Sequence, residues 1–425
     1  MFVSPREAGP ALRGCQLANS FPYRFDGYLL QLLVAMKILI APDKFKGGQR
    51  AREVANNIAA GICDVLRDAQ IEIAPVADGG EGTADVICDA LSGTWRECQA
   101  HDALGRPVTA RYAWLPERAT AVMEMSEVAG LKHLRLETRG LEQATTLGVG
   151  EMMLDAVKLG AREIVVGVGG SLTNDGGFGM ARVLGFRFFD GGGKELKGGV
   201  IELRTLARID TKDVVGVLVP STYLKDRRLT QPPLQRVRVV AAADVQNPLL
   251  GEHGATRVFG PQKGATTEQL NLLEEALERL ADIVARDLGV EERSALGAGA
   301  GGGLAFGLMS FSGATIRRGF EVVAEAIGLE DKMRGADIVV TGEGSLDRQS
   351  LNGKAPVEVA RLARQLGKPI FAVVGRTDGD PCLMELFDGI YATVDPAGSE
   401  AENIARAAEL LRRAGRELAS SLPRG

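Results

Sequence analysis

The stretch EIVVGVGGSLTNDGGFGMARVL spans residues 163–184. Its first part, 163–168, is a short apolar run of the kind found in strands that are buried on both faces. Glycine, hydroxyl and acidic residues follow this run, and residues 176–184 are then predicted to form a helix. The same order of strand, glycine-rich turn and helix recurs along the chain from residue 37. This repetition predicts an α/β fold with a largely parallel sheet.

The remaining elements follow the same alternation. Further strands are predicted at 37–41, 71–76, 236–242, 337–341, 368–374 and 389–393. Further helices are predicted at 51–67, 82–91, 148–159, 268–288, 320–327, 353–366 and 402–420. Residues 95–125 differ, because apolar and polar residues alternate there between turns at 105–107 and 116–117. That alternation predicts antiparallel hairpins.

The hairpins and the long middle of the chain predict that a second α/β domain is inserted into the first. We expect the first domain to comprise residues 36–80 and 300–425, and the inserted domain to comprise 81–299. The least regular stretch, 210–235, contains three prolines and a run of charged residues. We expect that stretch to be an exposed insertion loop.

Residues 1–35 differ in character from the rest of the chain. They mix proline, arginine, glycine and phenylalanine without a sustained period, and they match neither a signal peptide nor a transit peptide well. Met36 stands directly before the first predicted strand. We therefore expect Met36 to be the true start, with 1–35 a mis-called upstream extension or a disordered tail.

Composition excludes several classes of function. The 425 residues carry a net charge of −5 without a block of lysine or arginine, which disfavours binding to nucleic acid or to an anionic membrane. No run of about 18 apolar residues is present, so no membrane span is expected. The five cysteines are scattered and never in CxxC spacing, which fits a reducing cytoplasm. Only three histidines occur, without HExxH spacing, and zinc catalysis is therefore disfavoured.

Acidic residues follow five of the predicted strands, and glycines accompany four of these acids. The acids are Asp43, Asp78, Asp175, Asp244 and Glu343, the last of which is followed by Asp347. In α/β sheets, ligands bind outside the carboxyl ends of the strands. Glycine-rich loops present backbone N–H groups to phosphate oxygens, and carboxylates hold Mg²⁺. The five loops together predict a site for a polyphosphate and a divalent cation.

Two other functions stay open at this point. The run of alanine and glycine at 298–303 is similar to a dinucleotide-binding loop, although Leu304 stands where the last glycine of GxGxxG belongs. One alternative is therefore an oxidoreductase of a hydroxy acid that uses a dinucleotide. The other alternative is a non-catalytic nucleotide sensor. Neither a Walker A motif nor a GxSxG motif is present in the sequence.

A family resemblance rests on a series of longer motifs. These are APDKFKG at 41–47, DGGEGT at 78–83, LGRPV at 104–108, TTLGVG at 145–150, GGSLTNDGG at 169–177, DVQNPL at 244–249, VFGPQKGA at 258–265, TGEGSLDRQS at 341–350 and GKAP at 353–356. In this order they resemble the motifs of the class I glycerate kinases, over about residues 36–400. Departures from the family pattern are Gly48 for serine, Leu172 for alanine, Ala243 for cysteine and Glu358 for a small residue.

The resemblance implies a Rossmann-like parallel-sheet domain with a second, inserted α/β domain. It also implies ATP-dependent phosphorylation of D-glycerate with Mg²⁺, with 2-phosphoglycerate as the preferred product. The partner is then a small molecule, with no nucleic acid and no membrane, and a homodimer stays open. Gly48 is expected to weaken one helix cap or phosphate contact.

Roles for individual residues follow as hypotheses. Lys46 is expected to reach a transferring phosphate, and Asp175 is the candidate base or metal carboxylate, with Asp78 and Asp244 as rivals. The metal is assigned to Asp244 and Asp347. Candidate nucleotide- or phosphate-binding residues are Gly47, Gly79, Gly80, Gly342, Glu343, Gly344 and Ser345. Candidate substrate-binding residues are Arg106, Asn174, Lys263 and Lys354.

Overall fold

The computed structural model describes residues 35–45, 48–130, 140–215, 218 and 236–422. The predictions for residues 1–34 lie outside these ranges, as do those for Lys46 and Gly47. Most of the predicted insertion loop at 210–235 also lies outside them. None of the helices in the described ranges is long and apolar enough to cross a membrane.

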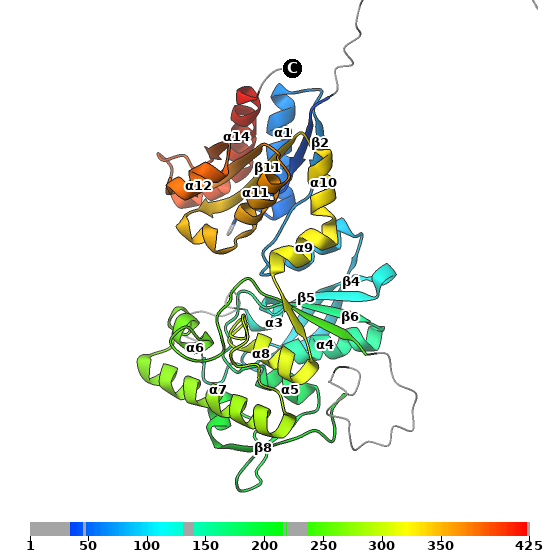
Figure 1. The fold of residues 1–425 in the computed structure, drawn as a ribbon, viewed down its shortest axis with the longest axis vertical. Coiled ribbons are helices and arrows are strands. Elements are labelled where there is room, and N and C mark those ends of the chain that lie inside the picture. Colours follow the sequence, from blue (N-terminus) through cyan, green and yellow to red (C-terminus); the bar gives the residue numbers. More distant parts are fainter. Residues whose placement is uncertain (1–34, 46–47, 131–139, 216–217, 219–235, 423–425) are drawn as a thin grey trace, which may run out of the picture. The chain divides into compact units, whose positions relative to one another are not determined.

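One sheet has five strands, all of them parallel (Figure 1). Its order is β13-β12-β11-β1-β2. The strands are β1 (Lys37–Ile40), β2 (Gln70–Ile73), β11 (Ile338–Leu346), β12 (Ile370–Thr377) and β13 (Gly389–Ala392). The prediction of a parallel α/β sheet is confirmed, because every pair of neighbouring strands here is separated by at least one helix in the sequence.

Successive side chains of β1 point to opposite faces of this sheet. Ile38 and Ile40 pack with helices α1 (Ala51–Val65) and α14 (Ala407–Ser421) in one buried cluster. Leu39 belongs to another cluster that contains α11 (Ala355–Gln365). Since side chains alternate along a strand, the continuous apolar run of β1 is what two covered faces require.

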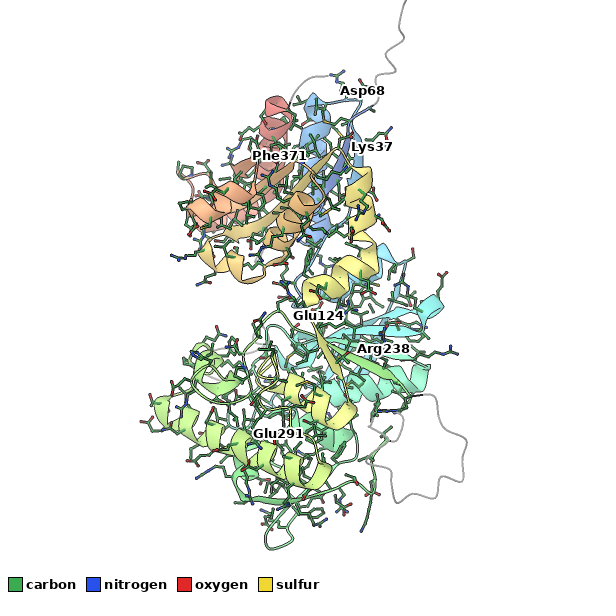
Figure 2. All side chains as sticks on the ribbon, in the orientation of Figure 1. Lys37, Asp68, Glu124, Arg238, Glu291 and Phe371 are labelled. Carbon is green, nitrogen blue, oxygen red and sulfur yellow. The ribbon has the colours of Figure 1, made fainter. Side chains whose placement is uncertain are left out.

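A second sheet has six strands in the order β10-β9-β6-β5-β4-β3. Here β3 (Thr94–His101), β4 (Pro107–Leu115) and β5 (Thr120–Glu124) form antiparallel hairpins, which confirms that prediction. The strands β6 (Glu163–Gly167), β9 (Arg238–Ala242) and β10 (Thr315–Arg317) then continue the sheet in parallel with β5. Glu124 lies at the carboxyl end of β5 and Arg238 at the amino end of β9. Because β5 and β9 run in the same direction, the two residues mark opposite ends of the strands (Figure 2).

Helices cover both faces of the six-stranded sheet. One face packs against α4 (Leu147–Leu159), α5 (Phe178–Val183) and α7 (Thr267–Leu288). The other face contacts α2 (Thr83–Ala90) and α9 (Gly319–Ile327). The predicted division into two domains stays a prediction, and β10 extends the six-stranded sheet beyond the expected boundary at residue 299.

The remaining elements are short. They are the two-stranded sheet β7 (Arg187–Asp190) and β8 (Leu206–Asp210), and the helices α3 (Ser126–Ala129), α6 (Ala255–Phe259), α8 (Leu304–Gly307), α10 (Leu329–Gly335), α12 (Pro381–Leu386) and α13 (Glu400–Ala405). Among the described residues, the 3-10 helices are η1 (Pro116–Arg118), η4 (Val200–Thr205), η6 (Pro261–Lys263) and η8 (Arg348–Asn352), and η7 (Leu308–Ser312) is a π-helix.

Two element predictions were wrong. The strand expected to end at 341 continues to Leu346, because β11 keeps pairing with β12 as far as Leu346 and Thr377. Glycines permit this close pairing, since a Cβ on Gly342 would lie 2.1 Å from the carbonyl oxygen of Val373. The single helix expected at 402–420 is instead two helices, α13 and α14, which meet at Arg406.

Helices α1 and α14 cross at glycines. A Cβ on Gly61 would lie 2.1 Å from the carbonyl oxygen of Arg412, and one on Gly415 would lie 2.5 Å from that of Ile58. No side chain fits at such distances without moving the backbone. The contact therefore depends on both glycines.

Replacing Gly61 by Ala is expected to lower the free energy of unfolding by about 1–3 kcal/mol, because the helices must separate. Urea denaturation measures this change. The matched control is Gly335→Ala, at a helical glycine where a Cβ would meet no atom within 4 Å. That control is expected to be neutral or stabilising by up to about 1 kcal/mol. Equal effects of the two substitutions would contradict the packing argument.

Candidate active site

Three acidic residues of the five-stranded sheet lie close together near the carboxyl ends of its strands, two after their strands and Glu343 within β11. Asp43 follows β1, and its backbone N–H donates to the carbonyl of Gly342 in β11 at 2.8 Å. Burial raises the pKa of Asp43 well above its usual range, and the charges of Asp78 and Glu343 raise it further. The sequence argument placed all three residues at strand ends, and the structure brings them within electrostatic reach of one another.

Asp244 joins this group from the six-stranded sheet, where it follows β9. Its Oδ1 accepts from the backbone N–H of Gly319, at 3.0 Å, at the start of α9. Its Oδ2 is buried and has no hydrogen-bond partner among the described residues. Burial, followed by the charge of Asp78, raises the pKa of Asp244 to about 7.

Gly79 allows these two segments to meet. A Cβ on Gly79 would lie 2.7 Å from the Cα of Gly319 and 3.3 Å from Oδ2 of Asp244, and the φ of Gly79 is +83°. Any larger residue would therefore displace Asp244 or α9. Gly169 is similarly constrained, because a Cβ on Gly169 would lie 2.6 Å from the Cα of Gly80, whereas a Cβ on Gly80 would lie 3.1 Å from Oδ1 of Asp78.

A second group surrounds Lys354. Its Nζ donates to Oε2 of Glu343 at 3.2 Å and to the carbonyl of Ser345 at 3.1 Å, and lies 3.9 Å from Asp347. Burial raises the pKa of Glu343, and the charge of Lys354 opposes that shift. Asp347 has partners for both oxygens, since it accepts from the N–H of Gln349 at 3.0 Å and from the hydroxyl of Ser345 at 3.1 Å. Glu343, Ser345 and Asp347, which come from one motif, thus lie beside Lys354, which the sequence offered as a candidate substrate residue.

Asp175 lies in a different environment, which is almost closed to solvent. It is 1% exposed and joins the starts of α4 and α5. Its Oδ2 accepts from the backbone N–H and hydroxyl of Thr146, at 2.8 and 2.9 Å, and from Gly179 N–H at 3.1 Å. Its Oδ1 accepts from Gly177 N–H at 3.1 Å. Burial raises the pKa of Asp175, and these hydrogen bonds oppose the rise.

The other predicted substrate residues are dispersed. Asn174 is fully buried and donates to Thr256 at 3.0 Å. Lys263 is 2% exposed and donates to Ser171 and to the carbonyl of Thr173. Arg106 lies in the turn between β3 and β4, where it pairs with Asp102 at 2.6 Å with 58% of its side chain exposed. Lys46 and Gly47 lie outside the described residues.

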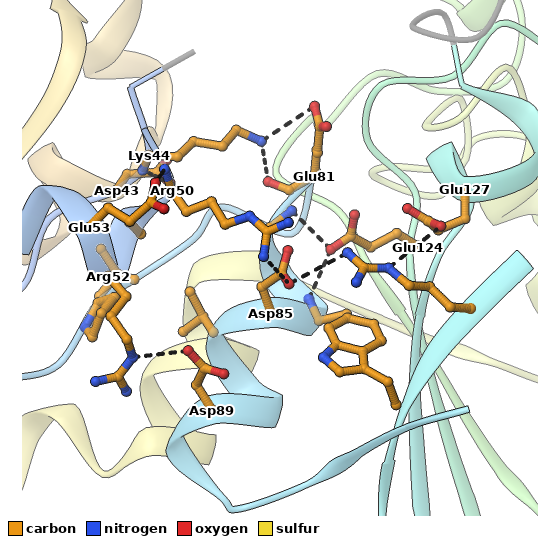
Figure 3. A pocket seen from close by; sticks show the side chains of 18 of the residues that line it. Asp43, Lys44, Arg50, Arg52, Glu53, Glu81, Asp85, Asp89, Glu124 and Glu127 are labelled. Atoms are coloured by element: carbon orange, nitrogen blue, oxygen red, sulfur yellow. Dashed lines mark hydrogen bonds and ion pairs between the residues drawn. The ribbon is translucent and has the colours of Figure 1, made fainter. Parts of the chain in front are cut away.

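A cavity of about 440 Å³ lies beside Asp43 (Figure 3). Its lining includes Arg50, Arg111 and Glu124, which were not predicted from the sequence. Glu81, Asp85 and Asp89 recur every four residues on one side of α2 and its preceding turn. They pair with Lys44 at 3.7 Å, Arg50 at 3.8 Å and Arg52 at 2.9 Å respectively. The four-residue spacing of Glu81, Asp85 and Asp89 is the signal in the sequence that could have identified these three acids as one group.

Glu124 lines this cavity and is hydrogen-bonded to the start of α2. Its Oε1 accepts from the backbone N–H groups of Gly82 and Ala84, both at 2.9 Å, at the start of α2. A carboxylate therefore already occupies the helix N-terminus at which the DGGEGT motif predicted a phosphate. Burial raises the pKa of Glu124, because its charged form is costly there.

Within the described ranges, no three His, Cys, Asp or Glu side chains form a group that could hold a metal ion by themselves. Mg²⁺ is commonly held by one or two carboxylates together with phosphate oxygens and water. The free Oδ2 of Asp244 and the neighbouring Asp78 fit this smaller donor set.

The run at 298–303 packs against the protein itself. A Cβ on Gly302 would lie 1.9 Å from the carbonyl oxygen of Thr173, and one on Gly303 would lie 2.9 Å from the Cα of Gly176. These glycines therefore serve close packing of two backbones. The dinucleotide alternative is not favoured.

Comparison with known proteins gives one consistent result. A family model described as the glycerate kinase family matches residues 38–423. A protein named glycerate kinase from Bacillus subtilis (strain 168) is 38% identical over 389 residues, which cover 91% of this chain and 98% of the relative. A glycerate 2-kinase from Escherichia coli (strain K12) is 36% identical, covering 92% and 99% respectively. A solved structure described as a glycerate kinase 2 from Salmonella typhimurium LT2 superimposes with a TM-score of 0.78 at 36% identity, covering 91% and 98%.

Replacing Glu124 by Gln keeps the hydrogen-bonding geometry but removes the buried charge. The raised pKa of Glu124 means that folding favours its protonated form. The stability of the wild type relative to Glu124→Gln is therefore expected to fall as pH rises from the ordinary carboxyl range through that raised pKa. Urea denaturation at several pH values measures this difference. Glu97→Gln, at an exposed position of β3, is the control and is expected to show no such trend.

Proposed function

Because this chain belongs to the glycerate kinase family, we propose that it transfers the γ-phosphoryl group of ATP to a hydroxyl of D-glycerate. The observation that carries the proposal is the gathering of Asp43, Asp78, Asp244 and Glu343 near the carboxyl ends of the strands, where Glu343 also pairs with Lys354. In the reaction a glycerate hydroxyl oxygen bonds to the γ-phosphorus, the bond to the bridging oxygen breaks, and ADP leaves. Catalysis of this kind depends mainly on positioning and on neutralising charge.

We propose that Asp78 accepts the hydroxyl proton. Asp78 is partly exposed, and the hydrogen bond found for it here is the one that it accepts from Gly80 at 3.2 Å. Asp175 is less suited to this role, because all four of its hydrogen bonds already come from Thr146 and the start of α5. Its geometry supports a role in holding the glycine-rich loop.

Asp244 is better suited than Asp347 to bind the metal. Asp244 has one buried oxygen without a partner, whereas both oxygens of Asp347 accept hydrogen bonds. Mg²⁺ bound here would neutralise negative charge on phosphate oxygens. Lys354 is positioned to add a positive charge at the same edge, and 34% of its side chain is exposed. Lys46, beside Gly47, keeps its proposed role on the transferring phosphate.

The glycine segments 79–80 and 342–345 are proposed to contact the nucleotide phosphates. For the organic acid, Arg106 and Asn174 stay proposed contacts without further support. The relative named glycerate 2-kinase supports the 2-hydroxyl as the acceptor. A cytoplasmic location and a homodimer also stay proposals, and the four cysteines described as free, Cys63, Cys88, Cys98 and Cys382, fit the first of them.

The full chain, incubated with ATP, Mg²⁺ and D-glycerate, is expected to yield a new phosphomonoester in ³¹P NMR, and its coupling pattern identifies the 2-hydroxyl. Omitting Mg²⁺ is the control. A folded protein that binds ATP without turnover would point instead to a nucleotide sensor. Oxidation of NADH with hydroxypyruvate in the absence of ATP would point to the oxidoreductase.

Replacing Asp244 by Asn is expected to raise the Mg²⁺ concentration for half-maximal activity roughly tenfold or more, which corresponds to about 1.4 kcal/mol. Asp347→Asn is expected to have a smaller effect. Binding of Mn²⁺ to the protein and ADP, followed by electron paramagnetic resonance, gives a readout that is independent of turnover. A larger effect of Asp347→Asn in both assays would reverse the assignment.

A further inference from the structure

Lys263 is a buried lysine whose ammonium group donates hydrogen bonds to the loop between β6 and α5. It ends the 3-10 helix η6 and is 2% exposed. Its Nζ donates to the hydroxyl of Ser171 at 3.0 Å and to the carbonyl oxygen of Thr173 at 2.7 Å. Burying an amine is costly unless it is hydrogen-bonded, so this arrangement needs both acceptors.

Both acceptors belong to the segment that joins β6 to α5. At its start, this segment touches the proposed active site, because a Cβ on Gly169 would lie 2.6 Å from the Cα of Gly80. Gly167 approaches the carbonyl oxygen of Gly79 in the same way, at 2.7 Å. The contacts therefore run from Lys263 through residues 169–173 to the loop that carries Asp78.

Other contacts hold the segment from its other side. The backbone N–H of Leu172 donates to the carbonyl oxygen of Ala129 at 2.7 Å, and Ser171 forms an isolated bridge with Gly130. Lys263 thus supplies a side-chain anchor opposite a backbone anchor. Removing the lysine leaves the segment with its backbone contacts to residues 129–130 but without this side-chain anchor. The hydroxyl of Ser171 and the carbonyl oxygen of Thr173 then lose their hydrogen bonds to Lys263.

We propose that Lys263 is a positioning residue, which holds residues 169–173 so that the Gly79–Gly80 turn and Asp78 keep the geometry that phosphoryl transfer requires. The proposal rests on the proposed function and gives Lys263 a role other than direct contact with the substrate. Small displacements of reacting groups are costly, since about 1 Å can reduce the rate roughly 100-fold.

The charge state of Lys263 provides a signature. Burial lowers its pKa to about 7, and the charge of Asp175, the titratable group that acts on it among the described residues, opposes that shift. Charge-assisted hydrogen bonds are stronger than neutral ones. As pH rises through about 7, the lysine loses its proton and its hold on Ser171 and Thr173 weakens.

The test compares Lys263→Met and Lys263→Arg with the wild type and with Lys212→Met, whose lysine side chain is 85% exposed. We expect Lys263→Met to lower kcat by roughly tenfold or more, with a smaller change in the KM for glycerate. Lys263→Arg is expected to restore part of the rate and to remove the fall in kcat above about pH 7, because arginine stays charged. Lys212→Met is expected to match the wild type.

Two further measurements test the same contact, and the second of them does not depend on glycerate being the substrate. Ser171→Ala removes one acceptor, and its effect on kcat is expected to be non-additive with that of Lys263→Met. Hydrogen exchange of the amides at 169–173 is expected to be faster in Lys263→Met, and this measurement needs no turnover. Wild-type kcat, pH profile and exchange in Lys263→Met would overturn the proposal, whereas an inactive wild type would overturn the proposed function alone.

Discussion

Several carboxylates gather near the carboxyl ends of the strands, where the ion pairs of the described residues reach only some of them, and this constraint shapes the surrounding structure. Asp43 and Asp244 each have a pKa raised by burial and by the charge of Asp78. Like charges at one edge destabilise the folded protein unless something neutralises them. Lys354 relieves only Glu343 and Asp347, with which it pairs. The proposed role of Mg²⁺ follows from this imbalance, because at Asp244 burial and the charge of Asp78 outweigh the opposing charge of Arg318.

Glycines allow the segments that follow the strands of the two sheets to approach each other closely. Gly79 approaches Gly319 at the start of α9, and Gly80 approaches Gly169 after β6. In each case two backbones meet at a distance that excludes a Cβ. The glycine-rich motifs therefore perform a packing role that is visible without any ligand. Contact between these segments and phosphate, as proposed, would come from backbone N–H groups that the same packing holds in place.

The sequence predicted much of the fold and part of the site, and the limits have physical causes. Parallel strands and antiparallel hairpins follow from apolar runs and from alternation, both of which are local patterns. Asp43, Asp78 and Glu343 were located because strand ends of a parallel sheet share an edge. Glu124 was missed, because it ends a hairpin strand without a glycine loop and acts on α2, which lies far from it in sequence. The continuation of β11 to Leu346 was missed because glycines in TGEGS indicate a turn unless a neighbouring strand pairs with them.

Asp175 and Lys263 show how a motif identifies an important position without defining its role. An aspartate within TNDGG is equally compatible with a catalytic carboxylate and with a cap for the following helix. The four hydrogen bonds of Asp175 favour the second role, and its charge acts on Lys263 within the same buried region. The FGPQKG motif then supplies a cation to the GGSLTNDGG motif, and this contact crosses about ninety residues of sequence. Only the folded chain reveals such a pairing, because neither motif carries a local signal of the other. In the proposed site, the two motifs therefore support the loops and do not themselves contact the reacting atoms.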